Sequence, residues 1–302
     1  MSRPHEGKLA IVTGGSRGIG EAVTRALARK GANLVIAYTS DSSRAATLQL
    51  CSELESAHAV RCLSVQANLE QPAPAADKIL AAARELSSSY RPSSGFQVDI
   101  LVNNAGVSSN QFLNDPAKGP ITAEEFNRVY TVNVLAPLLL MQAAAPHLPH
   151  DRSGRIVSVS SVSSSIGYQG QSVYAGSKAA VEAMTRTWSR ELAGRATVNC
   201  VNPGPAWSDM YAKVGPAFWN INQPYVDAAP LAEYHGEEDV LAKVGHEDAQ
   251  RFDRTVREDM GGRRPGFTSE IAGTIDMLCS DEAGWTTGSV VCANGGMKMS
   301  IA

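Results

Sequence analysis

The chain has 302 residues, 43% of them hydrophobic and 19% charged, and a formal net charge of −3 at pH 7. These values are typical of a globular protein with a substantial core, and they give no electrostatic reason to expect nucleic-acid binding. Its five cysteines are far apart and include no C-x-x-C pair, which fits neither a disulfide framework nor a zinc site.

The amino-terminal segment enters a strand-like apolar run within eight residues and lacks the features of a secretory signal. No other segment approaches the roughly 18 uninterrupted apolar residues that a membrane span needs. The sparse cysteines suit a reducing compartment. We therefore expect a cytoplasmic protein that binds neither membrane nor nucleic acid.

Short runs of strand-forming residues alternate with longer amphipathic segments along the chain. This alternation predicts βαβ units around a parallel sheet, and nearly continuous apolar runs such as VDILVNN predict helices on both sheet faces. We expect a doubly wound, seven-stranded α/β fold in a single domain spanning residues 1–302. Its strands are predicted at Leu9–Thr13, Asn33–Tyr38, Val60–Ala67, Val98–Asn103, Gly154–Ser160, Thr197–Asn202 and Ser289–Ala293.

Three segments interrupt this rhythm and are predicted to be loops rather than domain linkers. Ser87–Gly95 is rich in serine, proline and glycine and should form a surface excursion. Ser108–Pro120 follows the carboxyl end of the fourth strand, where such sheets keep their ligand crevice. The longest, from about Ser208 to Gly262, is rich in aromatic and charged residues and is expected to form an enlarged substrate lid.

A glycine-rich turn joins the first strand to the first helix in the run LAIVTGGSRGIGEAV. Glycine suits a backbone that approaches a pyrophosphate closely, and the following helix offers free N–H groups to it. The spacing of Gly14, Gly18 and Gly20 differs from the G-x-G-x-x-G fingerprint, but the strand-turn-helix context is the required one. The turn therefore predicts a dinucleotide site.

The end of the second strand distinguishes NADP from NAD. An acidic residue there binds the ribose 2′-hydroxyl of NAD, whereas this strand ends in Tyr38, Thr39 and Ser40. Arg17 and Arg44 are cationic partners for a 2′-phosphate, although Arg44 equally suits a solvated helix face. Asp41 argues against NADP if it turns inward. We predict NADP(H).

A second motif places Tyr174 and Lys178 four residues apart on a helix that begins near Ser172. Both side chains then project from one face. A tyrosine acting as general acid or base near neutral pH needs a nearby cation to lower its pKa, and Lys178 supplies one. Ser161, at the end of a preceding strand, would hold a substrate carbonyl by a hydrogen bond. The neighbouring serines are interpreted as loop-forming hydroxyls.

Together these motifs resemble those of the short-chain dehydrogenase/reductase family, whose fold is Rossmann-type. The matches, in order, are TGGSRGIG, NNAG at Asn103 to Gly106, VNV around Asn133, the set Ser161/Tyr174/Lys178, PGP at Pro203 to Pro205, and a late ANGG. The resemblance covers essentially Gly7 to Met297. Within the family it is similar to microbial ketoreductases, including fungal enzymes of secondary metabolism.

The resemblance implies the roles of four residues: Tyr174 is the acid/base, Lys178 lowers its pKa and binds the nicotinamide ribose, Ser161 orients the substrate, and Asn133 holds a water in a proton relay. Asn68, followed by Leu69, replaces the usual aspartate at adenine, and Ser208 replaces a threonine at the carboxamide. The expected cofactor contacts are Gly14, Ser16, Arg17, Gly18, Ile19, Gly20, Tyr38, Thr39, Ser40, Asn68, Leu69, Asn104, Ala105, Gly106, Tyr174, Lys178, Pro203, Gly204 and Ser208.

The aromatic residues of the 208–262 segment and its flank allow two interpretations: they enclose a bulky substrate, or they pack the insertion onto the body or a neighbouring subunit. The residues are Trp207, Tyr211, Phe218, Trp219 and Tyr225. His235 and His246 have no metal-site spacing and are interpreted as solvated, so no metal is expected. The helices bearing Tyr174 and Asn133 form subunit interfaces in the resembling family, which implies a homodimer or homotetramer; core packing explains their small residues equally well.

We expect an NADPH-dependent oxidoreductase that reduces a carbonyl of a fairly bulky molecule, such as a secondary-metabolite intermediate, to an alcohol. Hydride comes from the nicotinamide and the proton from Tyr174. Two alternatives remain: reduction of C=N or reduction coupled to cyclisation on the same scaffold, and a non-catalytic NADP-binding sensor or scaffold. The complete set of four catalytic candidates disfavours the second.

Overall fold

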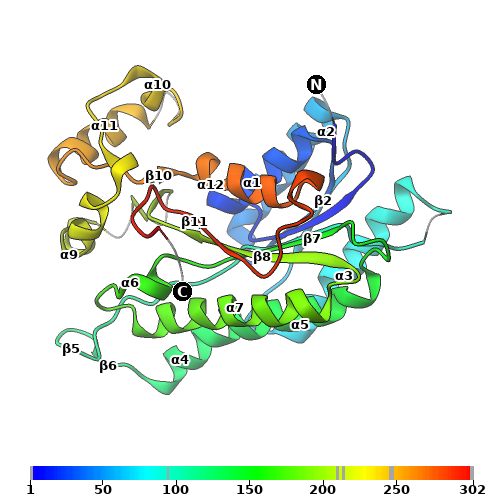
Figure 1. Ribbon diagram of the computed structural model, residues 1–302, viewed down its shortest axis with the longest axis horizontal. Coiled ribbons are helices and arrows are strands. Elements are labelled where there is room, and N and C mark those ends of the chain that lie inside the picture. The colour runs from blue at the N-terminus through cyan, green and yellow to red at the C-terminus, as the bar shows by residue number, and fades with distance from the viewer. Residues whose placement is uncertain (1–2, 94, 209–210, 213–214, 245–247, 300–302) are drawn as a thin grey trace.

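The seven predicted strands form one parallel sheet in a computed structural model that describes residues 3–93, 95–208, 211–212, 215–244 and 248–299. The order is β11-β8-β7-β4-β1-β2-β3 (Figure 1). Their bounds are β1 Leu9–Thr13, β2 Asn33–Tyr38, β3 Cys62–Gln66, β4 Ile100–Asn103, β7 Gly154–Val159, β8 Ala196–Pro203 and β11 Val290–Ala293. The predicted doubly wound α/β fold is confirmed.

Helices cover both faces of the sheet, as Figure 1 shows. One layer contains α1 (Gly18–Arg29), α2 (Arg44–His58) and α12 (Thr268–Leu278). The opposite layer contains α3 (Pro72–Tyr90), α4 (Ala123–Tyr130), α5 (Ala136–Ala144) and α7 (Ser172–Glu191). The side chains of successive strand residues point alternately to the two layers. Ala10 and Val12 lie in the core on the side of α1 and α12, and Leu9 and Ile11 lie in the core on the side of α3 and α5. Both faces being buried accounts for the nearly continuous apolar strands.

The first predicted loop, Ser87–Gly95, is partly helical, because α3 continues to Tyr90. The hydroxyl of Ser88 donates to the carbonyl of Arg84 at 2.9 Å, and that of Ser89 to the carbonyl of Leu86 at 2.7 Å. Serines can bond back to their own helix in this way, so a serine run does not by itself end one. Residue 94 lies outside the described residues.

The second predicted loop, Ser108–Pro120, contains a small hairpin. Its strands are β5 (Asn114–Asp115) and β6 (Gly119–Pro120), which pair antiparallel. The carboxylate of Asp115 accepts hydrogen bonds from the backbone N–H groups of Ala117 and Lys118, both at 2.9 Å, and so stabilises the turn. The rest of the segment has no regular structure.

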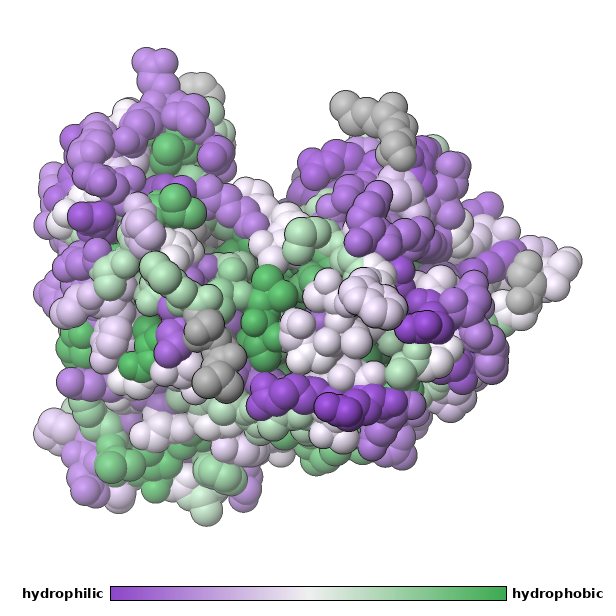
Figure 2. Space-filling model, in the orientation of Figure 1, coloured by the Kyte–Doolittle hydropathy of each residue, from purple (hydrophilic) through white to green (hydrophobic). Residues whose placement is uncertain are grey.

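The longest predicted loop is largely helical. It contains α9 (Pro216–Asp227), the short helices η4 (Pro230–Ala232) and α10 (Glu238–Leu241), and α11 (Ala249–Glu258). It leaves the body after β9 (Ala206–Trp207) and returns at β10 (Gly266–Phe267), and these two strands pair in parallel. Figure 2 shows the surface hollowed between the lobe that carries α10 and α11 and the body that carries α2.

The insertion has its own small core. Its buried members are Trp219, Tyr234, Phe252, Val256, Met260 and Phe267. Trp207 lies edge-on to Phe252, with ring centroids 5.0 Å apart and an interplanar angle of 88°. Burial of these rings stabilises the helices, which accounts for the difference from the predicted loop.

The helical run Ala123–His147 is long and apolar enough to cross a membrane by length and composition. Its apolar residues Leu140, Met141 and Ala144 are buried in the core beneath the sheet. Packing in the core therefore accounts for these three residues, while 39% of the apolar window as a whole is buried.

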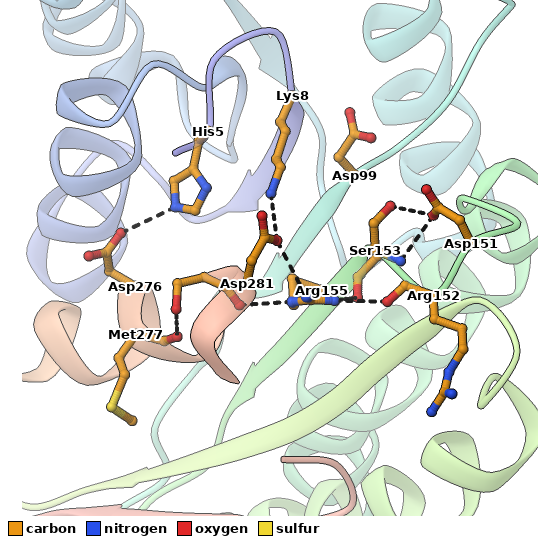
Figure 3. A network of polar contacts seen from close by, with 12 residues as sticks. His5, Lys8, Asp99, Asp151, Arg152, Ser153, Arg155, Asp276, Met277 and Asp281 are labelled. Atoms are coloured by element: carbon orange, nitrogen blue, oxygen red, sulfur yellow. Dashed lines mark hydrogen bonds and ion pairs between the residues drawn. The ribbon is translucent and has the colours of Figure 1, made fainter. Parts of the chain in front are cut away.

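A polar network ties the chain's start to α12 and the segment after it, as Figure 3 shows. The carboxylate of Asp276 lies 3.6 Å from the buried His5 imidazole and 2.5 Å from the Lys30 ammonium group. Arg155 donates to the carbonyl of Ser280 at 2.9 Å and lies 3.4 Å from Asp281. This network fixes the terminal segment on the body.

Asp276→Asn is expected to destabilise the protein by about 2 kcal/mol at pH 7, because charge-assisted hydrogen bonds are lost. Burial raises the pKa of Asp276, but the nearby His5 imidazole and Lys30 ammonium group outweigh it and hold that pKa below its usual value. The carboxylate therefore stabilises the fold above the unfolded-state pKa of about 4, and the contribution is lost as the pH falls through the folded-state pKa. Urea unfolding of the wild type and of Asp276→Asn, at pH values from 7 downward, measures the difference in their free energies of unfolding. A difference that does not change with pH would contradict this role of Asp276.

Candidate active site

The glycine loop between β1 and α1 adopts a backbone that only glycine allows without strain. Gly14 and Gly18 have φ values of +62° and +58°. A Cβ on Gly20 would overlap the carbonyl oxygen of Gly14 and the side-chain amide of Asn104. The loop thus forms a cradle whose backbone lies open at the amino terminus of α1, which is the geometry a pyrophosphate requires.

Thr13 and Asn104 join this loop to the segment after β4. The hydroxyl of Thr13 accepts the backbone N–H groups of Asn104 and Ala105, both at 3.1 Å. The side-chain amide of Asn104 donates to the carbonyl of Thr13 at 2.9 Å and to that of Gly14 at 3.2 Å. The predicted contacts Asn104, Ala105 and Gly106 therefore lie beside the glycine loop.

The end of β2 presents the residues predicted to select NADP. Tyr38 is buried, whereas Thr39, Ser40, Arg17 and Arg44 are exposed. The carboxylate of Asp41 accepts a hydrogen bond from the amide of Gln66 at 2.9 Å. Asp41 is therefore held against the end of β3, and the exposed arginines remain available to a 2′-phosphate.

Asn68 and Leu69 follow β3 as predicted. The Asn68 side-chain oxygen accepts the backbone N–H of Glu70 at 3.0 Å, and Leu69 is buried in the core beneath the sheet. Asn68 thus forms a local turn at the end of β3.

The segment after β8 closes the cradle from the other side. Gly204 approaches Asn294 so closely that an added Cβ would lie 3.0 Å from the Asn294 Cα. A Cβ on Gly18 would lie 4.0 Å from the Cβ of Ser208. Of the predicted contacts Pro203, Gly204 and Ser208, Ser208 therefore borders the glycine loop, although it is 190 residues from Gly18 in sequence, while Pro203 pairs with Ala293 and Gly204 packs against Asn294.

Ser161, Tyr174 and Lys178 meet where β7 ends against α7. The Lys178 ammonium group donates to the carbonyl of Val159, the last residue of β7, at 2.8 Å. It lies 5.7 Å from the centre of the Tyr174 ring. The Ser161 hydroxyl interacts with the Tyr174 phenol and accepts the backbone N–H of Ser163 at 3.2 Å. The one-turn spacing on the helix thus places both side chains on the face that meets the sheet.

Burial governs the protonation of Tyr174 and Lys178. Burial raises the pKa of Tyr174, and the hydrogen bond with Ser161 offsets only part of that rise. Burial also lowers the pKa of Lys178 to about 8, against the opposing influence of Cys200 and Glu182. Without a bound cofactor, the phenol is therefore protonated at neutral pH.

Asn133 lies in a short π-helical turn, Thr131–Leu135, between α4 and α5. Its side-chain oxygen accepts the backbone N–H of Val107 at 2.8 Å, and its N–H₂ group donates to the carbonyl of Val107 at 2.9 Å and to Ser177 at 3.0 Å. A π-turn frequently marks a functional site. Here the Asn133 side chain fixes the segment after β4 against α7, beside Gly106.

Sequence reasoning missed a buried carboxylate under the serine segment. Glu182 accepts hydrogen bonds from the hydroxyls of Ser160 and Ser164 at 2.6 and 2.7 Å. These serines, interpreted from the sequence as loop-forming hydroxyls, are therefore donors to a charged group. The available signal was an acidic residue within the small and apolar stretch KAAVEAM.

The aromatic residues of the insertion pack mainly on one another. Trp207, Tyr211 and Phe218 lie against the cluster that contains Trp219. Tyr225 contacts Tyr168 with ring centroids 5.0 Å apart. These contacts favour packing over substrate enclosure for the first four.

The histidines of the insertion form no metal centre in the described part of the chain. His235 is exposed and lies 3.2 Å from Glu233. No group of three or more potential metal ligands occurs among the described residues. His246 lies outside them.

Comparison with known proteins gives matches over nearly the whole chain. Residues 8–217 match the family model described as short chain dehydrogenase. L-xylo-3-hexulose reductase of Hypocrea jecorina (strain QM6a) is 71% identical over 305 residues, with 100% of each chain covered. L-xylulose reductase of Aspergillus niger is 54% identical over 300 residues, with 99% of each chain covered.

A solved structure with bound cofactor has the same fold. It is a blue fluorescent protein from a metagenomic library in complex with NADPH, with a TM-score of 0.77 and 30% sequence identity. The match covers 97% of this chain and 99% of that one. Its fold and cofactor agree with the nucleotide cradle described above.

Gly20→Ala is expected to lower NADPH affinity at least about tenfold, because the added methyl displaces the Gly14 carbonyl and deforms the cradle; tenfold corresponds to about 1.4 kcal/mol. Fluorescence titration with NADPH measures the effect. Gly194→Ala is the matched control, since a Cβ there meets nothing within 4 Å. Equal NADPH affinity in the two variants would show that the cradle does not hold the cofactor.

Proposed function

The chain belongs to the short-chain dehydrogenase/reductase family, and we propose that it reduces the carbonyl group of an open-chain ketose sugar to an alcohol. It is an NADP(H)-dependent oxidoreductase acting on carbonyls, and NADPH is the hydride donor. The observation that carries the proposal is the partly buried Tyr174 phenol, which lies beside Ser161 and Lys178 where β7 ends against α7. A protonated phenol next to a hydroxyl donor suits carbonyl reduction.

The residues around the site fit NADPH. The cradle formed by Gly14, Gly18 and Gly20 would hold the pyrophosphate, and the exposed Arg17 and Arg44 would hold the 2′-phosphate. When bound, NADPH supplies the hydride that reaches the carbonyl carbon. The protein's own side chains orient the substrate and supply the proton.

Three side chains have separate roles in carbonyl reduction. Ser161 donates a hydrogen bond to the substrate oxygen and orients it. Tyr174 gives its phenolic proton to that oxygen as the C–O π bond breaks, leaving an alcohol and a phenolate. The Lys178 ammonium group, 5.7 Å from the ring centre, stabilises the phenolate until solvent returns a proton. Asn133 keeps the segment after β4 in place against α7.

The two relatives support a sugar as substrate. One is named for reduction of L-xylo-3-hexulose and the other for reduction of L-xylulose, both of which are ketoses. The self-packed aromatic cluster of the insertion leaves fewer rings for a large apolar substrate. A polyhydroxylated ketose is therefore favoured over the bulky secondary metabolite suggested by the sequence. Nothing in the site specifically favours C=N reduction or cyclisation, and an enzyme is favoured over a sensor.

We also propose a homo-oligomer built on the helices that carry Tyr174 and Asn133. Two large apolar side chains on α4 and the adjoining turn, Phe126 and Leu135, are 43% and 40% exposed. Burial of such residues favours association. Sedimentation velocity is expected to give a dimer or tetramer, and a monomer at micromolar concentration would contradict the assembly.

The test of the proposed function uses NADPH with L-xylulose and with L-xylo-3-hexulose. Wild-type protein is expected to consume NADPH and to form a polyol identified by mass spectrometry and NMR. Tyr174→Phe should lower turnover about 10²- to 10⁴-fold, because the proton donor is lost. NADPH binding by the variant should remain measurable.

A control variant, Tyr90→Phe, removes a phenol at the end of α3 near Asn33, the first residue of β2, and should keep wild-type turnover because the site lies at the opposite, carboxyl ends of the strands. Wild-type turnover in Tyr174→Phe would overturn the role of Tyr174. Turnover of other carbonyls but of neither ketose would overturn the sugar assignment while leaving the reductase chemistry intact.

A further inference from the structure

A buried carboxylate lies directly beneath the segment that presents Ser161. Glu182 is 4% exposed and stands one turn beyond Lys178 on α7. A single oxygen, Oε1, accepts from Ser160 at 2.6 Å, from Ser164 at 2.7 Å and from the side-chain amide of Asn202 at 3.0 Å. Three donors thus converge on one oxygen of the carboxylate.

The donors bracket Ser161 along the chain. Ser160 precedes it at the end of β7, and Ser164 lies in the short helix α6 (Ser163–Ile166) that follows. The amide of Asn202, on β8, also donates to the backbone carbonyl of Ser161 at 2.7 Å. Glu182 and Asn202 together therefore fix the backbone on both sides of the catalytic hydroxyl. The Ser161 hydroxyl donates to that of Ser163 at 3.1 Å, whereas the carboxylate binds the serines on either side of it.

The same carboxylate acts on Lys178 through its charge. The two residues are four apart on α7, which places both side chains on one face of the helix, and the charge of Glu182 opposes the lowering of the Lys178 pKa by burial. Lys178 is 4% exposed, so an opposite charge nearby offsets part of the cost of keeping it protonated.

We propose that Glu182 is a positioning residue for this reaction: its buried carboxylate anchors the Ser160–Ser164 segment and holds Lys178 in its charged form. This inference rests on the proposed carbonyl reduction. It gives the residue two separable effects, one on Ser161 through hydrogen bonds and one on Lys178 through charge.

The other titratable groups that face Lys178 do not replace that charge. Cys200, on β8, adjoins it, but burial raises the pKa of the Cys200 thiol to about 12. The thiol is therefore neutral at the pH where Lys178 titrates. Tyr174, on the same helix, is neutral as well because burial raises its pKa. Gly106 and Asn133, which approach from the other elements, carry no charge.

The decisive experiment compares the pH dependence of kcat in wild-type holoenzyme and in Glu182→Gln. Loss of the negative charge lowers the pKa of Lys178, so its charged form disappears at lower pH. The alkaline limb of kcat should therefore move down by about one pH unit. At pH 7 kcat should also fall about tenfold, with NADPH affinity changed less, because Ser161 is less firmly held.

Three matched variants separate charge from structure. Ser164→Ala removes one hydrogen bond but keeps the charge, so it should lower kcat without moving the alkaline limb. Glu182→Asp keeps the charge, so its alkaline limb of kcat should lie closer to the wild-type position than that of Glu182→Gln. Glu191→Gln, at the exposed end of the same helix, should behave as wild type. Melting temperatures are recorded for all variants.

If kcat of Glu182→Gln falls at every pH but its alkaline limb stays at the wild-type position, the electrostatic role is overturned. An unchanged kcat at pH 7 would overturn the anchoring role. If the wild type reduces no carbonyl, the proposed function fails, and the inference is then tested directly by the ¹³Cε resonance of Lys178. That resonance should titrate at lower pH in Glu182→Gln, and an identical titration in both proteins would contradict the inference.

Discussion

The burial of the Lys178 ammonium group is the constraint on which the rest of the site depends. A cation taken out of water costs several kcal/mol unless partners compensate for the lost hydration. Here the compensation comes from the carbonyl of Val159, at the end of β7, and from the carboxylate of Glu182. Both partners require α7 to lie against the carboxyl ends of β7 and β8. That docking also places Tyr174 and Ser161 together.

The parallel sheet makes this arrangement possible, because all of its strands end at the same edge. The glycine loop follows β1, the Asn104–Gly106 segment follows β4, Ser161 follows β7, and the Gly204–Ser208 segment follows β8. Hydrogen bonds between Thr13 and Asn104 tie the glycine loop to the Asn104–Gly106 segment, and those of Asn133 tie that segment to α7. The insertion adds a lobe with its own aromatic core and leaves this framework unchanged.

Sequence reasoning predicted the seven strands and the glycine loop because both depend on local patterns: apolar runs bounded by turns, and backbone conformations reserved for glycine. Tyr174 and Lys178 followed from their spacing on one helix. The network around Glu182 was missed because its donors, Ser160, Ser164 and Asn202, meet only after three elements have packed. The helices of the insertion were missed because their stability comes from rings distant in sequence, such as Trp219 and Phe252. The extension of α3 to Tyr90 was hidden by serines that bond back to their own helix.

The central claim is that burial keeps the Tyr174 phenol protonated and ready to donate. Tyrosine labelled with ¹³C at Cζ, followed by NMR in cofactor-free protein, tests this most directly, with the Tyr174 resonance identified by its loss in a phenylalanine variant. Because burial raises the pKa of Tyr174 above its ordinary value of about 10, the resonance should keep its neutral-phenol position up to at least that pH. A resonance that moves to the phenolate position near pH 7 would contradict the account.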